Sequence, residues 1–364
     1  MPRPRTVYRG KRKYSWIITL AVTLLVLAIL LAVWLFYYLQ RFIVYDKDGL
    51  RLELSAQREE LLHPGGDNSA GAPAAFTPVD VEIVVEQRSF SELQTSAGSN
   101  VPPMKAAFVS AAQLNEATLK YYSANMGNFD TLVLELKDAD GFLHWHSRAE
   151  LADSFAVNGT TELADALAPL KEQGVHLTAQ ISALADSAMA QRNAPIALRN
   201  AADGSTYTDA SGRSYLDPYS DDTRAYLRTL LSELAFNGFD EVLLSGFVCP
   251  DGDQVRFSLT RTQTPTPAEA LASLALWLRE EADALGIRLS VVMESAALRS
   301  DKVLLGQDPD LLFRVFDRVA VETDFDHMSA DASAMENVLG EINHSRALLI
   351  TENYAPERES YIVK

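Results

Sequence analysis

The amino-acid sequence predicts an α/β fold, a (β/α)8 TIM-type barrel preceded by one transmembrane helix. Two observations lead to this prediction. From residue 104 onward, apolar runs of strand length alternate with helical stretches. Before them, residues 16–39 form an apolar run without a charged side chain. The composition, 48% hydrophobic and 22% charged, is typical of a folded chain.

Residues 16–39 have the length and the flanks of a membrane-spanning helix. At about 1.5 Å per residue this segment reaches roughly 36 Å, enough to cross a bilayer. Residues 1–15 carry six Lys or Arg and no acid, which predicts a cytoplasmic tail and an extracytoplasmic C-terminal domain. A signal peptide has a shorter apolar core, and a buried soluble helix is rarely apolar on all sides. We therefore expect a single-pass anchor in the cell membrane, with the lipid bilayer as partner of residues 16–39.

Residues 40–103 have the composition of a juxtamembrane stalk and linker with short strands. The segment VYDKDGLRLELS (44–55) predicts a hairpin around Asp48-Gly49. A Gly-, Ala- and Pro-rich linker (63–78), a strand-like stretch (79–87) and a second linker (96–103) follow. The barrel is therefore expected over residues 104–364.

The barrel prediction depends on a repeated order of strand, helix and glycine. Helical stretches at 161–174, 220–238 and 266–286 each end on a glycine just before a strand. No Gly-rich dinucleotide or phosphate loop follows the first strand, which favours a barrel over an open doubly wound sheet. The sequence leaves open whether the terminal SYIVK completes the last unit. The other predicted strands are MKAAFVSA, TLVLELKD, HLTAQISA, EVLLSGFV, RLSVVMES, RVAVETDF and ALLITENY.

Charge and metal-ligand content exclude several classes of protein. A net charge of −17 argues against nucleic acid as a partner, because binding to phosphates needs clustered Lys and Arg. Cys249 is the single cysteine, so neither an intrachain disulfide nor a cysteine-based zinc site is available. His144 and His146 would share one side of a strand but have no third ligand nearby. The DADG turn at 138–141 offers too few oxygen ligands for calcium. We expect no metal and no cofactor.

The predicted strand ends carry the candidate site, because the chemistry of such barrels lies at the carboxyl ends of the strands. Alternation places Glu135 and Lys137 on one face of the second strand, and Val292 and Glu294 on one face of the fifth. An acidic cleft of the size of a sugar is expected. The strand-end residues are Ser110, Glu135, Lys137, Asp138, Gln180, Ser182, Ser245, Glu294, Glu322, Asp324 and Glu352.

Four stretches carry a family resemblance: LVLELKDADG (132–141), TDASGRSYLDPYS (208–220), NGFDEVLL (237–244), and LGIRLS (285–290) with the later GQD (306–308). As a set they resemble the glycoside hydrolase domain family of exported bacterial proteins, which has an α-amylase-like (β/α)8 barrel. The resemblance covers about 200 of the 364 residues and fades after Asp308. It implies a polysaccharide or cell-wall glycan as partner.

The departures from the family pattern fall at the implied catalytic centre. The resemblance implies an Asp nucleophile at the position of Ser245, a Tyr at Gly246 and an Arg at Val248. It also implies an Arg at Gln180 and an Asp at Val292. A retaining glycosidase needs a carboxylate nucleophile beside a carboxylic acid, so we expect impaired catalysis.

Three functions follow from these features. The first is a membrane-anchored, extracytoplasmic pseudoenzyme that binds a cell-envelope polysaccharide. The second is an active glycoside hydrolase with relocated carboxylates, Glu294 with Glu135 or Glu322. The third is a non-catalytic structural or protein-interaction module of the envelope. The candidate ligand-binding residues are Lys137, Asp138, Trp145, Gln180, Asp217, Tyr219, Ser245 and Glu294.

Some of these residues have a structural alternative. An ion pair between Glu135 and Lys137 inside the barrel would hold the strands in register instead of contacting a ligand. Asp217 would serve as a turn or capping residue ahead of the helix at 220–238. Trp145 is expected on an exposed hairpin, with its ring available to stack on a sugar.

Overall fold

The computed structural model describes residues 43–46, 49–52, 101–250, 253–259, 265–300, 302–340, 344–352 and 358–364. The chain divides into two compact units, Met1–Val84 and Val85–Lys364. The predicted cytoplasmic tail, the membrane helix at 16–39, the first linker (63–78), the strand expected at 79–87 and most of the second linker (96–100) lie outside the described residues. None of the helices in the described ranges has both the length and the apolar composition needed to cross a bilayer.

The first unit contains one described pair of strands. β1 (Ile43–Asp46) and β2 (Gly49–Leu52) pair antiparallel, with Asp46 opposite Gly49. This register confirms the hairpin expected around Asp48-Gly49.

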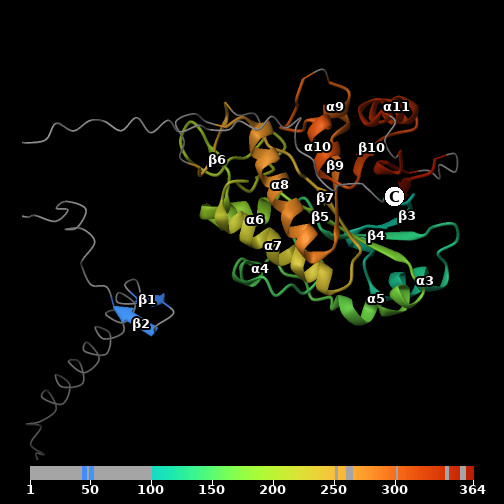
Figure 1. Cartoon of the computed structure of the whole chain (residues 1–364), viewed down its shortest axis with the longest axis horizontal. Coiled ribbons are helices and arrows are strands. Elements are labelled where there is room, and N and C mark those ends of the chain that lie inside the picture. Colours follow the sequence, from blue (N-terminus) through green and yellow to red (C-terminus); the bar gives the residue numbers. More distant parts are fainter. Residues whose placement is uncertain are drawn as a thin grey trace, which may run out of the picture. The chain divides into compact units, whose positions relative to one another are not determined.

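The second unit is a closed barrel of eight parallel strands (Figure 1). The last strand, β12 (Tyr361–Val363), closes the barrel, because it pairs with β11 (Ala347–Thr351) on one side and with β3 (Lys105–Val109) on the other. The C-terminus accordingly lies beside β3 (Figure 1). SYIVK is therefore the eighth strand, and the (β/α)8 prediction is confirmed. In barrel order the strands are β10 (Val319–Glu322), β11 (Ala347–Thr351), β12 (Tyr361–Val363), β3 (Lys105–Val109), β4 (Thr131–Lys137), β5 (His176–Ser182), β7 (Glu241–Ser245) and β9 (Arg288–Met293).

Helices follow the strands on the outside of the barrel. The three predicted helices correspond to α5, α7 and α8, and the glycines after them take positive φ angles: 72° at Gly174, 80° at Gly238 and 68° at Gly286. A residue without Cβ adopts this conformation at little cost, which stops each helix before its strand. The α-helices are α3 (Glu116–Ala124), α4 (Glu150–Ser154), α5 (Leu163–Glu172), α6 (Ser187–Arg192), α7 (Asp221–Phe236), α8 (Pro267–Leu285), α9 (Ser295–Leu298), α10 (Pro309–Val315) and α11 (Met328–Leu339).

Short elements occupy the connections. η2 (Ala111–Gln113), η3 (Ala194–Ile196) and η4 (His344–Arg346) are 3-10 turns. β6 (Arg199–Asn200) and β8 (Val255–Arg256) form a separate antiparallel pair from the connections that follow β5 and β7.

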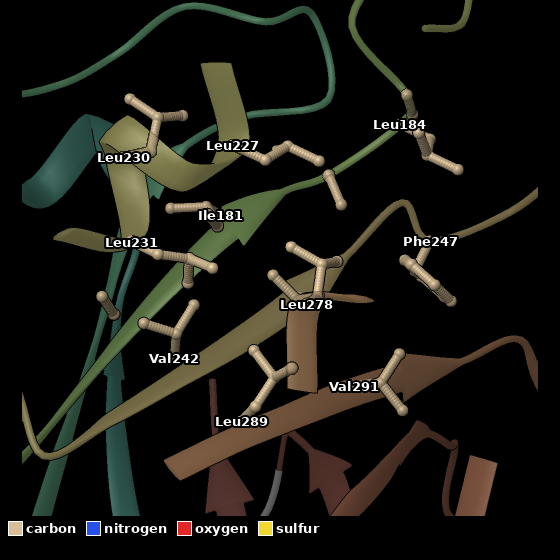
Figure 2. Packing of buried hydrophobic residues seen from close by; sticks show 14 of the residues in the cluster. Ile181, Leu184, Leu227, Leu230, Leu231, Val242, Phe247, Leu278, Leu289 and Val291 are labelled. Atoms are coloured by element: carbon tan, nitrogen blue, oxygen red, sulfur yellow. The ribbon is translucent and has the colours of Figure 1, made fainter. Parts of the chain in front are cut away.

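The hydrophobic core has two layers because side chains alternate along each strand. The larger layer lies between the barrel and its helices. Figure 2 shows part of it, with Leu227, Leu230 and Leu231 of α7 and Leu278 of α8 near Ile181, Val242 and Leu289 of the strands. The smaller layer fills the barrel interior with Met104, Ala106, Val133, Leu243, Ala320, Leu348, Ile350 and Ile362. The interior is thus packed, and a ligand can enter only at an end of the barrel.

The amino end of the barrel interior carries a buried ion pair. Arg318 Nε lies 3.3 Å from Glu241 Oε1, and both side chains are 1% exposed. Ser290 Oγ donates to the same carboxylate at 2.5 Å. Burial alone would raise the pKa of Glu241, but the hydrogen bond with His176 and the charge of Arg318 outweigh it and lower the pKa. The barrel interior therefore contains an ion pair at its amino end, between Arg318 and Glu241. The alternative of an interior pair between Glu135 and Lys137 would lie at the carboxyl end.

Candidate functional site

Strand register brings several of the predicted residues to the carboxyl end of the barrel. Glu135 pairs with Gln180, and Gln180 pairs with Leu243, whose side chain belongs to the barrel interior. Ser182 pairs with Ser245 two residues further along the same strands. Met293 pairs with Val321, so the next residues, Glu294 and Glu322, lie at one level on neighbouring strands. We call this end of the barrel, with Glu135, Gln180, Ser245, Glu294 and Glu322, the mouth.

The carboxylates of the mouth differ in their surroundings. Glu135 is half-buried, and its Oε2 accepts a hydrogen bond from the backbone N–H of Ala111 at 2.9 Å. Glu294 and Glu322 are exposed. Adjacent strands lie about 4.8 Å apart, so Glu294 and Glu322 are close neighbours. Glu135, on β4, is separated from Glu294 by β5 and β7. Of the two pairings considered above, register therefore favours Glu294 with Glu322.

Lys137 does not point into the mouth, contrary to the expectation from strand alternation. The pairing of β4 with β5 is irregular between Glu135 and Lys137, so that Lys137 pairs with Ile181 of the outer layer. Its ammonium is fully buried, 2.9 Å from Asp186 Oδ2, and it donates to the carbonyl of Ser182 at 2.5 Å. The predicted ion pair with Glu135 is wrong, because the bulge turns Lys137 to the other face of the strand.

Trp145 is buried rather than exposed, and the expectation of a surface ring is wrong. Its side chain is 1% exposed within the outer layer of the core. Its indole Nε1 lies 3.4 Å from Glu233 Oε2 on α7. The backbone N–H of Gly159 donates to the Trp145 carbonyl, which folds the following loop back on this segment. Stacking on a sugar is not open to a ring in this position.

Asp138 holds a tight turn beyond β4. Its Oδ1 accepts the backbone N–H groups of Gly141 at 2.9 Å and Phe142 at 3.0 Å. Its Oδ2 lies 2.8 Å from His144 Nε2. Burial raises the pKa of Asp138, but these hydrogen bonds and the charge of His144 outweigh it and lower the pKa. Within the described ranges, no group of three or more His, Cys, Asp or Glu side chains is arranged to hold a metal ion.

Asp217 is a turn residue, so the structural alternative to its proposed ligand-binding role is confirmed. It is 1% exposed, and its two oxygens accept backbone N–H groups from Tyr219 at 2.9 Å and from Ser258 at 2.5 Å. Burial raises its pKa. Tyr219 packs edge-on against Phe257, with the ring centroids 5.5 Å apart. Both residues therefore organise the loops outside the mouth.

The segment after β7 has no space for the Tyr that the family resemblance implies at Gly246. A Cβ on Gly246 would lie 2.4 Å from Ser182 Oγ and 2.8 Å from the Cβ of Ala185, so no Tyr fits there without movement. Val248 is 7% exposed and Cys249 is 1% exposed. Burial raises the pKa of the Cys249 thiol to about 12. This side of the mouth consists of small and apolar residues, with half-buried Ser245 at its edge.

Gln307 is a site residue that sequence reasoning did not single out. Its fully buried amide accepts the backbone N–H of Glu294 at 2.8 Å and donates to the carbonyl of Phe247 at 3.0 Å. It also lies 3.3 Å from the carbonyl of Val292. The turn that presents it has positive φ at both central residues, 53° at Leu305 and 74° at Gly306. A leucine in this conformation costs about 1–3 kcal/mol. The GQD motif (306–308) was the feature of the sequence that could have pointed to Gln307. Only the fold shows that this side chain links the segment after β7 to the end of β9.

A cavity opens beside the mouth at the ends of β10, β11 and β12. Its volume is about 530 Å³, within the usual range of ligand pockets. Lys364 Nζ lies in it, 2.7 Å from Glu322 Oε2 and 5.5 Å from the ring centroid of Phe108. Neither Lys364 nor Phe325 was predicted as a site residue, because only the closure of the barrel places the end of β12 beside β10 and β11. The lining residues are Glu322, Thr323, Asp324, Phe325, Asp326, Met328, Ile350, Thr351, Glu352 and Lys364.

Solved structures similar to this chain include glycoside hydrolases. The glycoside hydrolase domain of PgaB (BpsB) from Bordetella bronchiseptica is 13% identical, with a TM-score of 0.51 and coverage of 69% of this chain and 84% of that chain. Ega3 of Aspergillus fumigatus, solved with galactosamine, is 11% identical, with a TM-score of 0.43 and coverage of 71% and 81%. A hypothetical protein of Ruminiclostridium thermocellum is 19% identical, with a TM-score of 0.44 and coverage of 51% and 96%. At these identities the likeness shows the fold alone.

Sequence comparison identifies the family. A search of curated proteins gave no significant match. The profile of one domain family matches residues 106–321, from the first barrel strand to the sixth. This match covers more than half of the chain and agrees with the resemblance seen in its motifs. The protein therefore belongs to the family described as "Putative glycosyl hydrolase domain".

Proposed function

We propose that this protein is a glycan-binding barrel with impaired hydrolysis, anchored in the cell membrane and directed at a cell-envelope polysaccharide. The observation that carries the proposal is Ser245. It stands at the end of β7, where the family resemblance implies the nucleophilic Asp. A serine has no carboxylate, and Gly246 leaves no room for the Tyr that the family resemblance implies beside it.

The fold supports binding independently of catalysis. The interior of the barrel is filled, so a ligand would bind at the mouth and in the adjoining cavity rather than inside the barrel. Gln180 and Glu135 form one edge of the mouth, and Glu294 and Glu322 form another. Polar side chains of this kind make the hydrogen bonds by which a sugar ring is oriented.

A second function is supported by the register of β9 and β10. Retaining glycosidases hold two carboxyl groups about 5–5.5 Å apart, and Glu294 and Glu322 are close neighbours on adjacent strands. A relocated pair would make the protein an active hydrolase. Glu322 of this pair is bound to Lys364 through an ion pair that is largely exposed.

One experiment separates the two functions. The full chain, purified in a mild detergent, is assayed for binding to envelope polysaccharides and for hydrolysis of α- and β-linked oligosaccharides. We expect binding without turnover, and weaker binding by Glu294→Gln. Glu172→Gln, an exposed change on α5, is the matched control and should behave as the wild type. Turnover by the wild type that Glu294→Gln abolishes would establish the hydrolase instead.

A further inference from the structure

The cavity beside the mouth already holds an ammonium group. Lys364 Nζ sits 2.7 Å from Glu322 Oε2, and its ammonium lies over the face of Phe108 at 5.5 Å from the ring centroid. A carboxylate and an aromatic face are the two partners that recognise an organic ammonium in proteins. Glu322 lines the cavity and Phe108 lies next to it, on the other side of the Lys364 ammonium, so together they form a recognition site for a primary amine that Lys364 occupies.

The ammonium of Lys364 does not neutralise the negative charge of the carboxylates that line the cavity. Four carboxylates line the cavity (Glu322, Asp324, Asp326 and Glu352), and Lys364 is the one Lys or Arg among the lining residues. Asp324 has a partner in His327, whose Nδ1 lies 2.8 Å from its Oδ1. Such a cavity attracts a cation and repels an acidic sugar.

The seated ammonium can exchange with one from solution. The side chain of Lys364 is 32% exposed and that of Glu322 is 64% exposed. Exposed ion pairs contribute only about 0–1 kcal/mol, so their replacement costs little. Phe325 is 79% exposed on the cavity wall and offers an apolar surface against which a sugar ring can pack.

We propose that this cavity is a subsite for a sugar unit that carries a free amino group, and that the ligand's ammonium replaces Lys364 beside Glu322. The inference rests on the proposed function, since it specifies which glycan the barrel takes. In this proposal Lys364 competes with the ligand for Glu322 and does not contact the bound ligand. Removing this lysine should therefore tighten binding, whereas loss of an ordinary contact would weaken it.

The test compares two β-1,4-linked hexamers of the same length, one of glucosamine and one of N-acetylglucosamine. Binding to the full chain in detergent is measured by calorimetry at about pH 6, where an amine with an α-amino-like pKa is protonated. We expect tighter binding of the glucosamine hexamer, with an affinity that falls as salt increases. Lys364→Met should bind this hexamer about two- to fivefold more tightly, and Glu322→Gln about two- to fivefold more weakly.

The control separates the local effect from the change in net charge. Lys120→Met removes an exposed lysine from α3 and should leave both affinities unchanged. Equal affinity of the wild type for the two hexamers, or weaker binding of the glucosamine hexamer by Lys364→Met, would overturn the amine subsite alone. Failure of both hexamers and of envelope polysaccharides to bind would overturn the proposed function with it.

Discussion

A single buried amide, that of Gln307, connects the two strand ends on which the proposed site depends. Its contacts are all to backbone groups, of Glu294, Phe247 and Val292. It acts on the ligand only through the residues it positions. The strained backbone at Leu305 indicates that the surrounding structure holds this turn in place against its local preference.

We expect Gln307→Leu to lower the free energy of unfolding by about 1–3 kcal/mol, because it leaves buried peptide groups without a partner. Urea unfolding of the full chain measures the change. Gln173→Leu, which alters an exposed amide after α5, is the matched control and should stay within about 0.5 kcal/mol of the wild type. An unfolding midpoint unchanged in Gln307→Leu would show that this amide does not join the strand ends.

At the scale of elements, two outer helices are tied to one another by an ion pair between an exposed arginine and a buried carboxylate. Arg299, the C-cap of α9, donates to both oxygens of Asp331 on α11, at 2.7 Å and 2.6 Å. Thr323, just after β10, donates to Asp331 Oδ2 at 2.6 Å. These contacts join the wall of the cavity to the two helices around it. Burial raises the pKa of Asp331, but the hydrogen bonds from Arg299 and Thr323 outweigh it and lower the pKa.

The lowered pKa of Asp331 predicts a pH-dependent contribution to stability. A carboxyl whose folded pKa lies below its unfolded value of about 3.9 stabilises the fold above that pH, and the contribution is lost as the pH falls through the folded pKa. Asp331→Asn should therefore cost about 1–3 kcal/mol at neutral pH, with a difference from the wild type that shrinks below about pH 4. Urea unfolding from pH 7 to pH 3 tests this, with exposed Asp253→Asn as control. A constant difference across that range would contradict the prediction.

At the scale of the whole molecule, barrel closure depends on the last strand. β12 consists of Tyr361–Val363 and pairs with both β11 and β3. Ile362 fills the interior and is fully buried. The backbone N–H of Met104 also bonds to Ser360 Oγ at 3.1 Å, which fixes the start of the first barrel strand against the last.

Deletion of residues 359–364 should open two sheet edges and expose interior apolar side chains, so the chain should aggregate. Size-exclusion chromatography and thermal unfolding in detergent measure this. Removal of Lys364 alone keeps Tyr361–Val363 and their pairing with both neighbours, losing only one backbone bond, from its N–H to the Thr351 carbonyl, and is the control. A monodisperse product with an unchanged melting temperature after the longer deletion would mean that closure does not stabilise the barrel.

The proposed anchor predicts a topology for the whole chain. A reporter fused after Lys364 should be active only outside the cytoplasm, because the six basic residues of the tail keep the N-terminus inside. Replacing those residues by Gln should weaken this orientation. Protection of the C-terminus from protease in intact cells stripped of their wall would refute the prediction.

Local patterns in the sequence were sufficient for the architecture. The apolar runs, the glycines at 174, 238 and 286 and the lack of a phosphate loop predicted the barrel, because periodicity and helix termination depend on neighbouring residues. The acidic strand ends, and the positions of Glu135, Gln180 and Ser245, followed from the same alternation. The sequence by itself thus determined the fold and the end of the barrel at which to look.

The tertiary structure decided what each side chain does there. One bulge turned Lys137 away from the mouth, and a returning loop buried Trp145. Gln307 and Lys364 reached the site from distant parts of the chain. Such outcomes depend on register and on contacts between residues far apart in sequence, which local periodicity does not encode. Burial and partner choice are therefore fixed only once the barrel closes.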